Sequence, residues 1–386
     1  MTEQPRFGGF QPVVTKFVAE LFDGSIHLKR LQSISDATLG VVAGASLAIP
    51  IIGHSLAQAR SLVTKHATKQ VDRLLSNDKF VVWDYFAYWA LNVVADRKEI
   101  VVAMDWTDFD ADGQTTLVLS IVTSHGRATP VLWLSVWKDE LKGMRNNFED
   151  ACLVRLSEVL PKGVKVTILA DRGFGDHKLF EFLKKLGFEF VIRFRGNIRV
   201  AAADGETKLA SEWVGKDGRS RKLRGATVAG SEHPVGAVVC VHAKGMKESW
   251  SLAISDESKK PKEAIDYYGM RWTIEPSFRD TKDLRFGMGL SHMRISTPER
   301  RDRLLFLNAV AINILTILGA AGESLGMDRQ LKSNTSMKRT HSLFRQGCML
   351  YELMPNMPEV RLLPLISRFN EMLQQCRVCS KLFSIV

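Results

Sequence analysis

The sequence is poor in cysteine and lacks the short motifs of several common enzyme classes. Its 386 residues include five cysteines, an odd number scattered along the chain: Cys152, Cys240, Cys348, Cys376 and Cys379. A disulfide framework is therefore not expected, and a reducing compartment fits this usage better. The sequence contains neither a phosphate-binding GxxxxGK[S/T] loop nor an HExxH zinc motif. These absences argue against nucleotide hydrolysis and zinc peptidase chemistry.

Long uninterrupted hydrophobic runs are also missing. Residues 37–59 and 304–322 contain no Asp, Glu, Lys or Arg, and they approach the ~20 residues that cross a membrane. Both stretches are diluted by small or polar residues, and charge is dense elsewhere. The N-terminus does not show the basic and apolar regions of a secretory signal. We therefore expect two buried helices, no membrane partner and a cytoplasmic location.

Basic residues outnumber acidic ones. Lys and Arg total 53 against 42 Asp and Glu, which gives a formal charge of +11. This excess predicts a polyanionic partner, either nucleic acid or a membrane surface. The excess lies outside residues 99–195, where acidic residues slightly outnumber basic ones. The distribution favours an acidic centre framed by cationic regions.

Hydrophobic periodicity divides the chain into segments of different texture. Apolar residues recur at helical spacing through residues 17–95, and the period changes to two after Glu99. The following order of three strands, a helix, a strand, a helix and a strand predicts an α/β fold of the ribonuclease-H-like type. The predicted units are a helical N-terminal region (1–98), the first part of the core (99–195), a β-rich insertion (196–260), a core helix (261–297) and a helical C-terminal region (298–386).

Two aspartates stand at the ends of predicted strands. Asp105 ends the first strand in VVAMDWT, and Asp171 ends a largely apolar strand in VTILADRGFGD. A carboxylate at such a place is costly unless it is paired or holds a metal. Open α/β sheets also place their sites beyond the carboxyl ends of strands. Either aspartate alone would equally suit a helix N-cap or a turn, so their convergence is a hypothesis.

Four polar residues share one face of a predicted helix in YGMRWTIEPSFRDTK: Tyr268, Arg271, Glu275 and Lys282. At ~100° per residue they fall within roughly 60° of one another. A carboxylate flanked by two cations and a phenol suits a metal ligand among phosphate contacts, whereas a solvated charged face is the alternative. Pro276 lacks a backbone donor and predicts a kink or a restart of the helix.

A second cationic stripe lies near the N-terminus. Lys65, Lys69 and Arg73 recur every four residues in KHATKQVDRLLS, so they project from one side of a predicted helix. The apolar residues of the same segment supply a buried side. Both a solvated face and a phosphate-contacting face are compatible with this pattern.

These segments together resemble the bacterial insertion-sequence transposases of the DDE class. The chain is most similar to the subgroup marked by Y-(2)-R-(3)-E-(6)-K, insertion-sequence family four, whose spacing it matches at all four positions. MDWTDF, LADRGFGD and YGMRWTIEPSFRDTKD occur in the family's order, and the resemblance covers most of the chain.

The resemblance implies a metal-dependent active site. Asp105, Asp171 and Glu275 would form the DDE triad and hold two divalent cations, Mg²⁺ or Mn²⁺. The ions would activate water and then a DNA 3′-hydroxyl for attack on phosphodiester bonds. Carboxylate oxygens are hard ligands that suit such ions.

The resemblance also implies a set of DNA contacts. Tyr268, Arg271 and Lys282 would hold phosphates near the cleaved end, Arg193 would contact DNA, and Trp250 would stack on a flipped base. An ordinary surface role for Arg193 and a packing role for Trp250 are the alternatives.

The implied function is cut-and-paste DNA transposition. The protein would bind the terminal inverted repeats of its element, cut the double-stranded DNA and join the ends to target DNA. Two ends must be brought together, so a homodimer associated with the bacterial nucleoid is expected. A metal-dependent DNA nuclease without strand transfer and an inactive DNA-binding relative are the alternatives.

Overall fold

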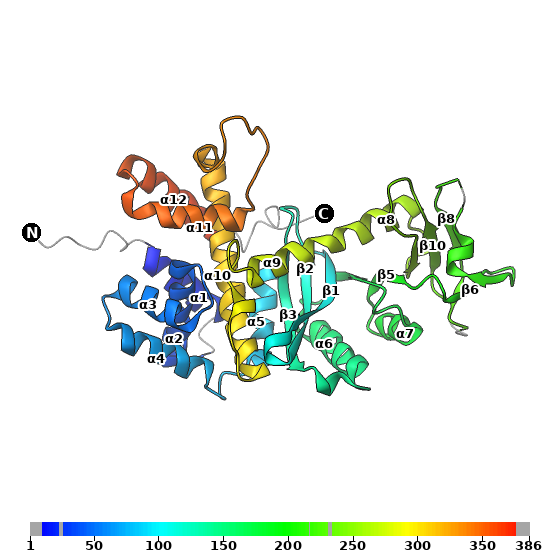
Figure 1. The fold of residues 1–386 in the computed structure, drawn as a ribbon, viewed down its shortest axis with the longest axis horizontal. Coiled ribbons are helices and arrows are strands. Elements are labelled where there is room, and N and C mark those ends of the chain that lie inside the picture. Colours follow the sequence, from blue (N-terminus) through cyan, green and yellow to red (C-terminus); the bar gives the residue numbers. More distant parts are fainter. Residues whose placement is uncertain (1–9, 23–25, 216, 231–233, 376–386) are drawn as a thin grey trace, which may run out of the picture.

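The N-terminal part of the protein is a cluster of helices. The computed structural model describes residues 10–22, 26–215, 217–230 and 234–375. The first helices are α1 (Phe10–Phe22), α2 (Leu28–Gly44), α3 (Ile49–Arg60), α4 (Thr64–Leu75) and α5 (Val82–Val94). The helical spacing predicted for residues 17–95 is thus confirmed in the described residues. In Figure 1 α1 to α4 lie together on one side of the long helix α10, whereas α5 lies on its other side, next to β3.

The next segment builds the first part of a mixed sheet. Its elements are β1 (Glu99–Phe109), β2 (Gln114–Val122), β3 (Ala128–Trp137), α6 (Arg145–Val159), β4 (Lys165–Ala170), α7 (His177–Lys185) and β5 (Glu189–Phe194). The strands lie in the order β3-β2-β1-β4-β5. The β1–β2 and β2–β3 pairs are antiparallel, whereas β1–β4 and β4–β5 are parallel. The predicted element order is confirmed, and the arrangement is compatible with a ribonuclease-H-like core.

The strands of the predicted insertion divide between two sheets. They are β6 (Arg199–Ala201), β7 (Thr207–Leu209), β8 (Arg221–Arg224), β9 (Thr227–Val228), β10 (Ala237–Val241) and β11 (Trp250–Ile254). Strands β11, β10 and β8 extend the core sheet beyond β5, while β7, β6 and β9 form a small sheet of their own. The predicted boundary at residue 196 therefore does not separate two independent sheets. Strand β11 pairs with the edge of β5 that would otherwise be open, and the buried strand β10 pairs with β11.

The segment with the four-residue stripe is two helices and not one. α8 (Pro261–Met270) and α9 (Ile274–Lys282) are joined by a 3₁₀ turn at Arg271–Thr273. Pro276 explains the break, because it cannot donate to the carbonyl four residues earlier and its ring crowds that carbonyl. The predicted interruption is thus confirmed, and it lies just before the proline. Both helices run along one side of the sheet from the strands of the insertion to α10, with α6 and α7 on the other side (Figure 1).

The C-terminal part is helical and packs on a buried central helix. Its helices are α10 (Pro298–Ser324), α11 (Leu343–Leu353) and α12 (Glu359–Gln375). α10 is long and apolar enough to cross a membrane, but 89% of its most apolar window is buried inside the protein. The other charge-free stretch is broken between α2 and α3, which meet at an angle of 99°. Both stretches thus behave as core helices, and α10 is buried because helices and sheet surround it.

Two glycines allow α10 and α11 to touch backbone to backbone. A Cβ atom at Gly319 would lie within 1.9 Å of the carbonyl oxygen of Leu343, and one at Gly347 within 1.9 Å of the carbonyl oxygen of Leu315. No side chain fits at either position unless the helices separate.

Gly319→Ala is expected to lower the free energy of unfolding by about 1–3 kcal/mol or more, because overpacking forces the two backbones apart. Thermal or urea unfolding measures the loss. Gly269→Ala is the control, since a Cβ there meets nothing within 4 Å and alanine favours a helix. Equal stability of the two variants would contradict the proposed backbone contact.

Three of the five cysteines, Cys152, Cys240 and Cys348, are buried free thiols. Cys376 and Cys379 lie outside the described residues. The described cysteines therefore act as small apolar core residues.

Candidate active site

Strand register brings the two aspartates together. Met104 in β1 pairs with Ala170, the last residue of β4, in parallel orientation. Asp105 and Asp171 follow these partners directly, so they leave adjacent parallel strands at the same level. The prediction that Asp105 ends its strand is wrong, because β1 continues to Phe109 in pairing with β2. Asp105 lies just beyond the last residue of β1 that pairs with β4.

Arg271 connects the sheet to the third carboxylate. Its guanidinium donates to Asp105 Oδ2 at 3.2 Å and lies 3.5 Å from Glu275 Oε1. The side chain of Arg271 is buried, whereas Glu275 is half exposed. Arg271 is thus held between two of the predicted catalytic acids, one on β1 and one on α9.

The charges of Asp171 and Glu275 act on Asp105. Burial raises the pKa of Asp105 to about 6, Arg271 opposes that rise, and the carboxylates of Asp171 and Glu275 add to it. Asp171 is also fixed locally, because its Oδ1 accepts a hydrogen bond from the Gly173 amide at 2.7 Å. The predicted triad therefore shares one electrostatic environment that a cation would stabilise.

The ligand atoms of the three acids suit a divalent metal, but the acids are not spaced as a metal centre in this structure. They offer hard oxygen ligands on a face that is partly open to solvent. Among the residues that the structure describes, no three Asp, Glu, His or Cys side chains gather closely enough to form a metal centre. Arg271, bound to Asp105 and Glu275, supplies the positive charge between them instead.

Tyr268 lies behind this site and is fully enclosed. Burial raises the pKa of its phenol, while the charges and hydrogen bonds of Arg271 and Arg193 lower it. Trp250 packs edge-on against its ring, with centroids 4.8 Å apart and planes at 74°. Tyr268 therefore links β11, β5 and α8, and Trp250 is half-buried by this packing.

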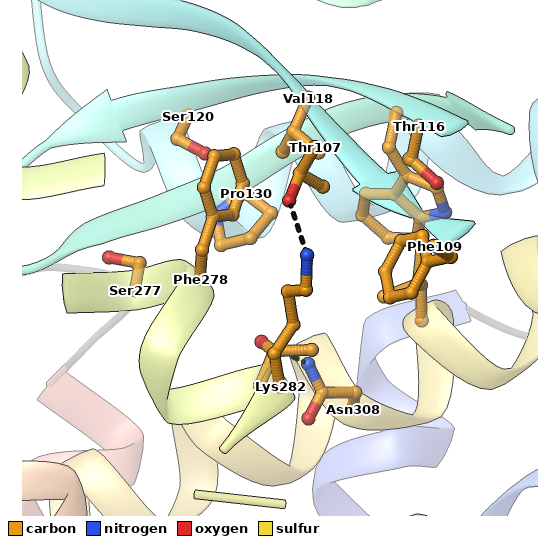
Figure 2. A pocket seen from close by; sticks show the side chains of 13 residues that line it. Thr107, Phe109, Thr116, Val118, Ser120, Pro130, Ser277, Phe278, Lys282 and Asn308 are labelled. Atoms are coloured by element: carbon orange, nitrogen blue, oxygen red, sulfur yellow. Dashed lines mark hydrogen bonds between the residues drawn. The ribbon is translucent and has the colours of Figure 1, made fainter. Parts of the chain in front are cut away.

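Lys282 points to the far end of β1. Its ammonium donates to Thr107 Oγ1 at 3.1 Å and to the Asp108 carbonyl at 2.6 Å, and it lies 4.6 Å from the centroid of the Phe109 ring. Figure 2 shows the lysine entering a pocket between α9 and the sheet, directed at Thr107. Burial lowers the pKa of Lys282. In this structure the lysine therefore fastens α9 to β1.

The N-terminal cationic stripe lies on α4 as predicted. Lys65, Lys69 and Arg73 are exposed on this helix, while Val71 and Leu74 are buried. Lys69 and Arg73 also line a groove of about 710 Å³ between α4 and the start of α2, together with Lys29 and Arg30. Residues from two helices thus form one basic surface.

A buried carboxylate that the sequence did not reveal supports the two segments that carry Asp105 and Asp171. Glu149 on α6 accepts hydrogen bonds from Trp106 Nε1 at 2.8 Å and from Arg145 Nε at 2.9 Å. Arg145 in turn lies over the rings of Trp106 and Phe174. Trp106 follows Asp105, and Phe174 follows Asp171 by three residues. In the sequence this pair looks like an ordinary i,i+4 helix pair, and only the adjacency of Trp106 to Asp105 hints at more.

A comparison with known proteins places the chain in a family. Residues 96–314 match the family described as the transposase DDE domain. No curated protein matches the chain. The matched range contains β1 and β4, the two strands that present Asp105 and Asp171, and the helix α9 that presents Glu275. Since the match covers more than half of the chain, this protein belongs to the DDE transposases.

Proposed function

We propose that this transposase belongs to the Y-R-E-K subgroup and moves its element by cut-and-paste transposition. The observation that supports this most is the meeting of Asp105, Arg271 and Glu275, which come from a strand and a helix far apart in the sequence. In this proposal the protein binds the inverted repeats at both ends of its element, cuts the DNA and joins the freed 3′ ends to target DNA.

Asp105, Asp171 and Glu275 would hold two Mg²⁺ or Mn²⁺ ions. Such ions supply an activated water or 3′-hydroxyl and stabilise the negative charge that develops on the reacting phosphate. The raised pKa of Asp105 agrees with a cation-binding role, because burial, and after it the carboxylates of Asp171 and Glu275, favour its protonated form until more positive charge is added.

Arg271 is the chain's own candidate for holding the reacting phosphate. Its guanidinium lies over the rings of Tyr268 and Trp272 and also donates to the Tyr268 hydroxyl, so both aromatic residues orient it. If metal ions bound Asp105 and Glu275, the Arg271 donors that now face these two acids would be free for phosphate oxygens. Tyr268 and Arg193 would then help to hold the bound DNA strand, since they contact one another and Tyr268 contacts Arg271.

Two of the proposed DNA contacts have partners within the protein. Lys282 donates to Thr107 and Asp108, and Trp250 packs against Tyr268. Both side chains would take up their DNA contacts in the DNA-bound protein.

We also propose that the protein is a homodimer that acts on nucleoid DNA. The C-terminal region, residues 298–386, would form a homodimer that holds two DNA ends together, and the protein would act in the cytoplasm on nucleoid DNA. An excision and strand-transfer assay with the element's own flanking DNA tests the whole proposal. Cut ends without joined products would favour the nuclease alternative, and bound but uncut DNA would favour an inactive relative.

The basic surface on α4 gives a separate test. Replacing Lys65, Lys69 and Arg73 by Gln is expected to flatten the dependence of DNA binding on salt by roughly one charge for each phosphate that these side chains neutralise. Binding measured over a series of salt concentrations gives the slope. Arg219→Gln, which alters a side chain that is 88% exposed elsewhere, is the control. An unchanged slope in the triple variant would remove α4 from the DNA-binding surface.

A further inference from the structure

Glu248 bridges two arginines beside the candidate active site. Its Oε1 lies 3.0 Å from Arg193 and its Oε2 lies 3.0 Å from Arg172. The three side chains come from the β10–β11 loop, from β5 and from the residue that follows Asp171. One carboxylate thus binds two guanidinium groups that the core sheet presents at its active edge.

The two arginines are held differently. The side chain of Arg193 is only 12% exposed, and it also donates to the Ser249 carbonyl at 3.2 Å. Its Nε is buried without a hydrogen-bond partner among the described residues. Arg172 is 54% exposed and reaches Glu248 from the surface. Arg193 is therefore a fixed cation, while Arg172 can follow whichever anion is present.

The acid between them is easily displaced. Glu248 is 52% exposed, and solvent screens exposed ion pairs strongly. The arginines lower the pKa of Glu248, so it is charged when bound. A DNA phosphate carries the same single charge on two free oxygens and accepts from arginine in the same geometry.

The location points to the DNA backbone as the competing anion. Arg172 is adjacent to Asp171, and Arg193 shares the hydroxyl of Tyr268 with Arg271. Arg271 continues the chain of contacts to Asp105 and Glu275. An anion bound by Arg172 and Arg193 would thus lie next to a strand engaged at the predicted triad.

We propose that Arg172 and Arg193 form a binding site for a backbone phosphate of DNA, and that Glu248 occupies this site in the DNA-free protein. Glu248 is then an internal competitor, and the β10–β11 loop must release the arginines before DNA is fully engaged. This inference rests on the proposed function, because it requires a protein that binds DNA at this edge of the sheet.

The test is DNA binding by Glu248→Gln over a series of salt concentrations, with a fluorescently labelled DNA duplex as the probe. Freeing one phosphate site is expected to steepen the salt dependence by roughly one charge and to tighten binding about threefold at low salt. Adding Arg172→Ala to Glu248→Gln should remove this gain. Arg172 is half exposed, so its truncation leaves the core intact.

Glu158→Gln is the matched control. Glu158 is 53% exposed and lies 3.0 Å from Arg155 on α6, so the change removes the same charge from a similar pair. A gain that is equal in Glu158→Gln, that is absent in Glu248→Gln, or that survives Arg172→Ala would overturn the inference. If neither the parent nor any variant binds the duplex at low salt while all melt cooperatively, the proposed function fails as well. A parent that binds without any gain in Glu248→Gln contradicts only the inference.

Discussion

Asp105→Asn, Asp171→Asn and Glu275→Gln are each expected to lower DNA strand cleavage by roughly a thousandfold or more, since losing several kcal/mol of metal-centred stabilisation has that effect on rate. The amides keep the volume of the acids but not their charge. In Asp105→Asn the new amide oxygen can still accept from Arg271, so the fold and the arrangement of α8 and α9 should persist. The measurement is single-turnover cleavage of the element's end with Mg²⁺ or Mn²⁺.

Asp108→Asn provides the control for these variants. Asp108 lies on the same strand, is 58% exposed and pairs with Lys138. Its substitution should leave cleavage within a few-fold of the parent. DNA binding by the three active-site variants should remain close to that of the parent. Three variants that cleave as fast as the parent would refute the assignment of the triad.

Arg301→Met is expected to be the most damaging single change to stability. Arg301 on α10 is fully buried, forms an ion pair with Asp112, donates to Gln114 Oε1 at 2.7 Å and lies 3.8 Å from the centroid of the Phe109 ring. Removing it leaves a carboxylate that is only 5% exposed without its cation. Breaking a buried pair in this way costs about 3–5 kcal/mol, a large part of the ~5–15 kcal/mol that stabilises a typical protein.

Urea unfolding of Arg301→Met, of Arg294→Met and of the double variant Arg301→Met/Asp112→Asn tests this expectation. Arg294 approaches the same carboxylate but is 80% exposed, so its loss should change stability little. Neutralising Asp112 together with Arg301 should recover part of the loss, because no unpaired charge remains buried. If Arg294→Met lowers the free energy of unfolding as much as Arg301→Met does, the burial of the arginine does not determine the loss of stability.

The mutational effects at Arg301 should extend to the active site. Asp112 accepts from the Ile295 amide at 3.1 Å, and Gln114 donates to the Ile295 carbonyl at 2.9 Å. These bonds hold the turn between β1 and β2 against the start of α10. Since β1 also carries Asp105, the buried pair supports the strand on which the predicted triad depends.

Local sequence signals predicted most elements of the core but not which strand pairs with its edge strand β5. The alternation in residues 99–137 and the apolar run before Asp171 indicated the correct strands, because side-chain period and burial are properties of short segments. The short alternating runs after residue 196 also predicted strands, and the structure has β6 to β11 there. Whether those strands form their own sheet or extend another depends on backbone partners distant in sequence, and this is what β11 decides by pairing with β5.

By itself, the sequence determined the chemistry available to this protein: two aspartates beside strand ends, a Y-R-E-K stripe, a basic excess and a buried apolar helix. The tertiary structure alone decided which of these side chains meet. Parallel register places Asp105 beside Asp171, and the turn before Pro276 brings Arg271 between Asp105 and Glu275. It also directs Lys282 to β1, joins Glu149 to Trp106 and sets Glu248 across two arginines. Such contacts depend on distance in space, which strand register and helix packing fix only after the whole chain has folded.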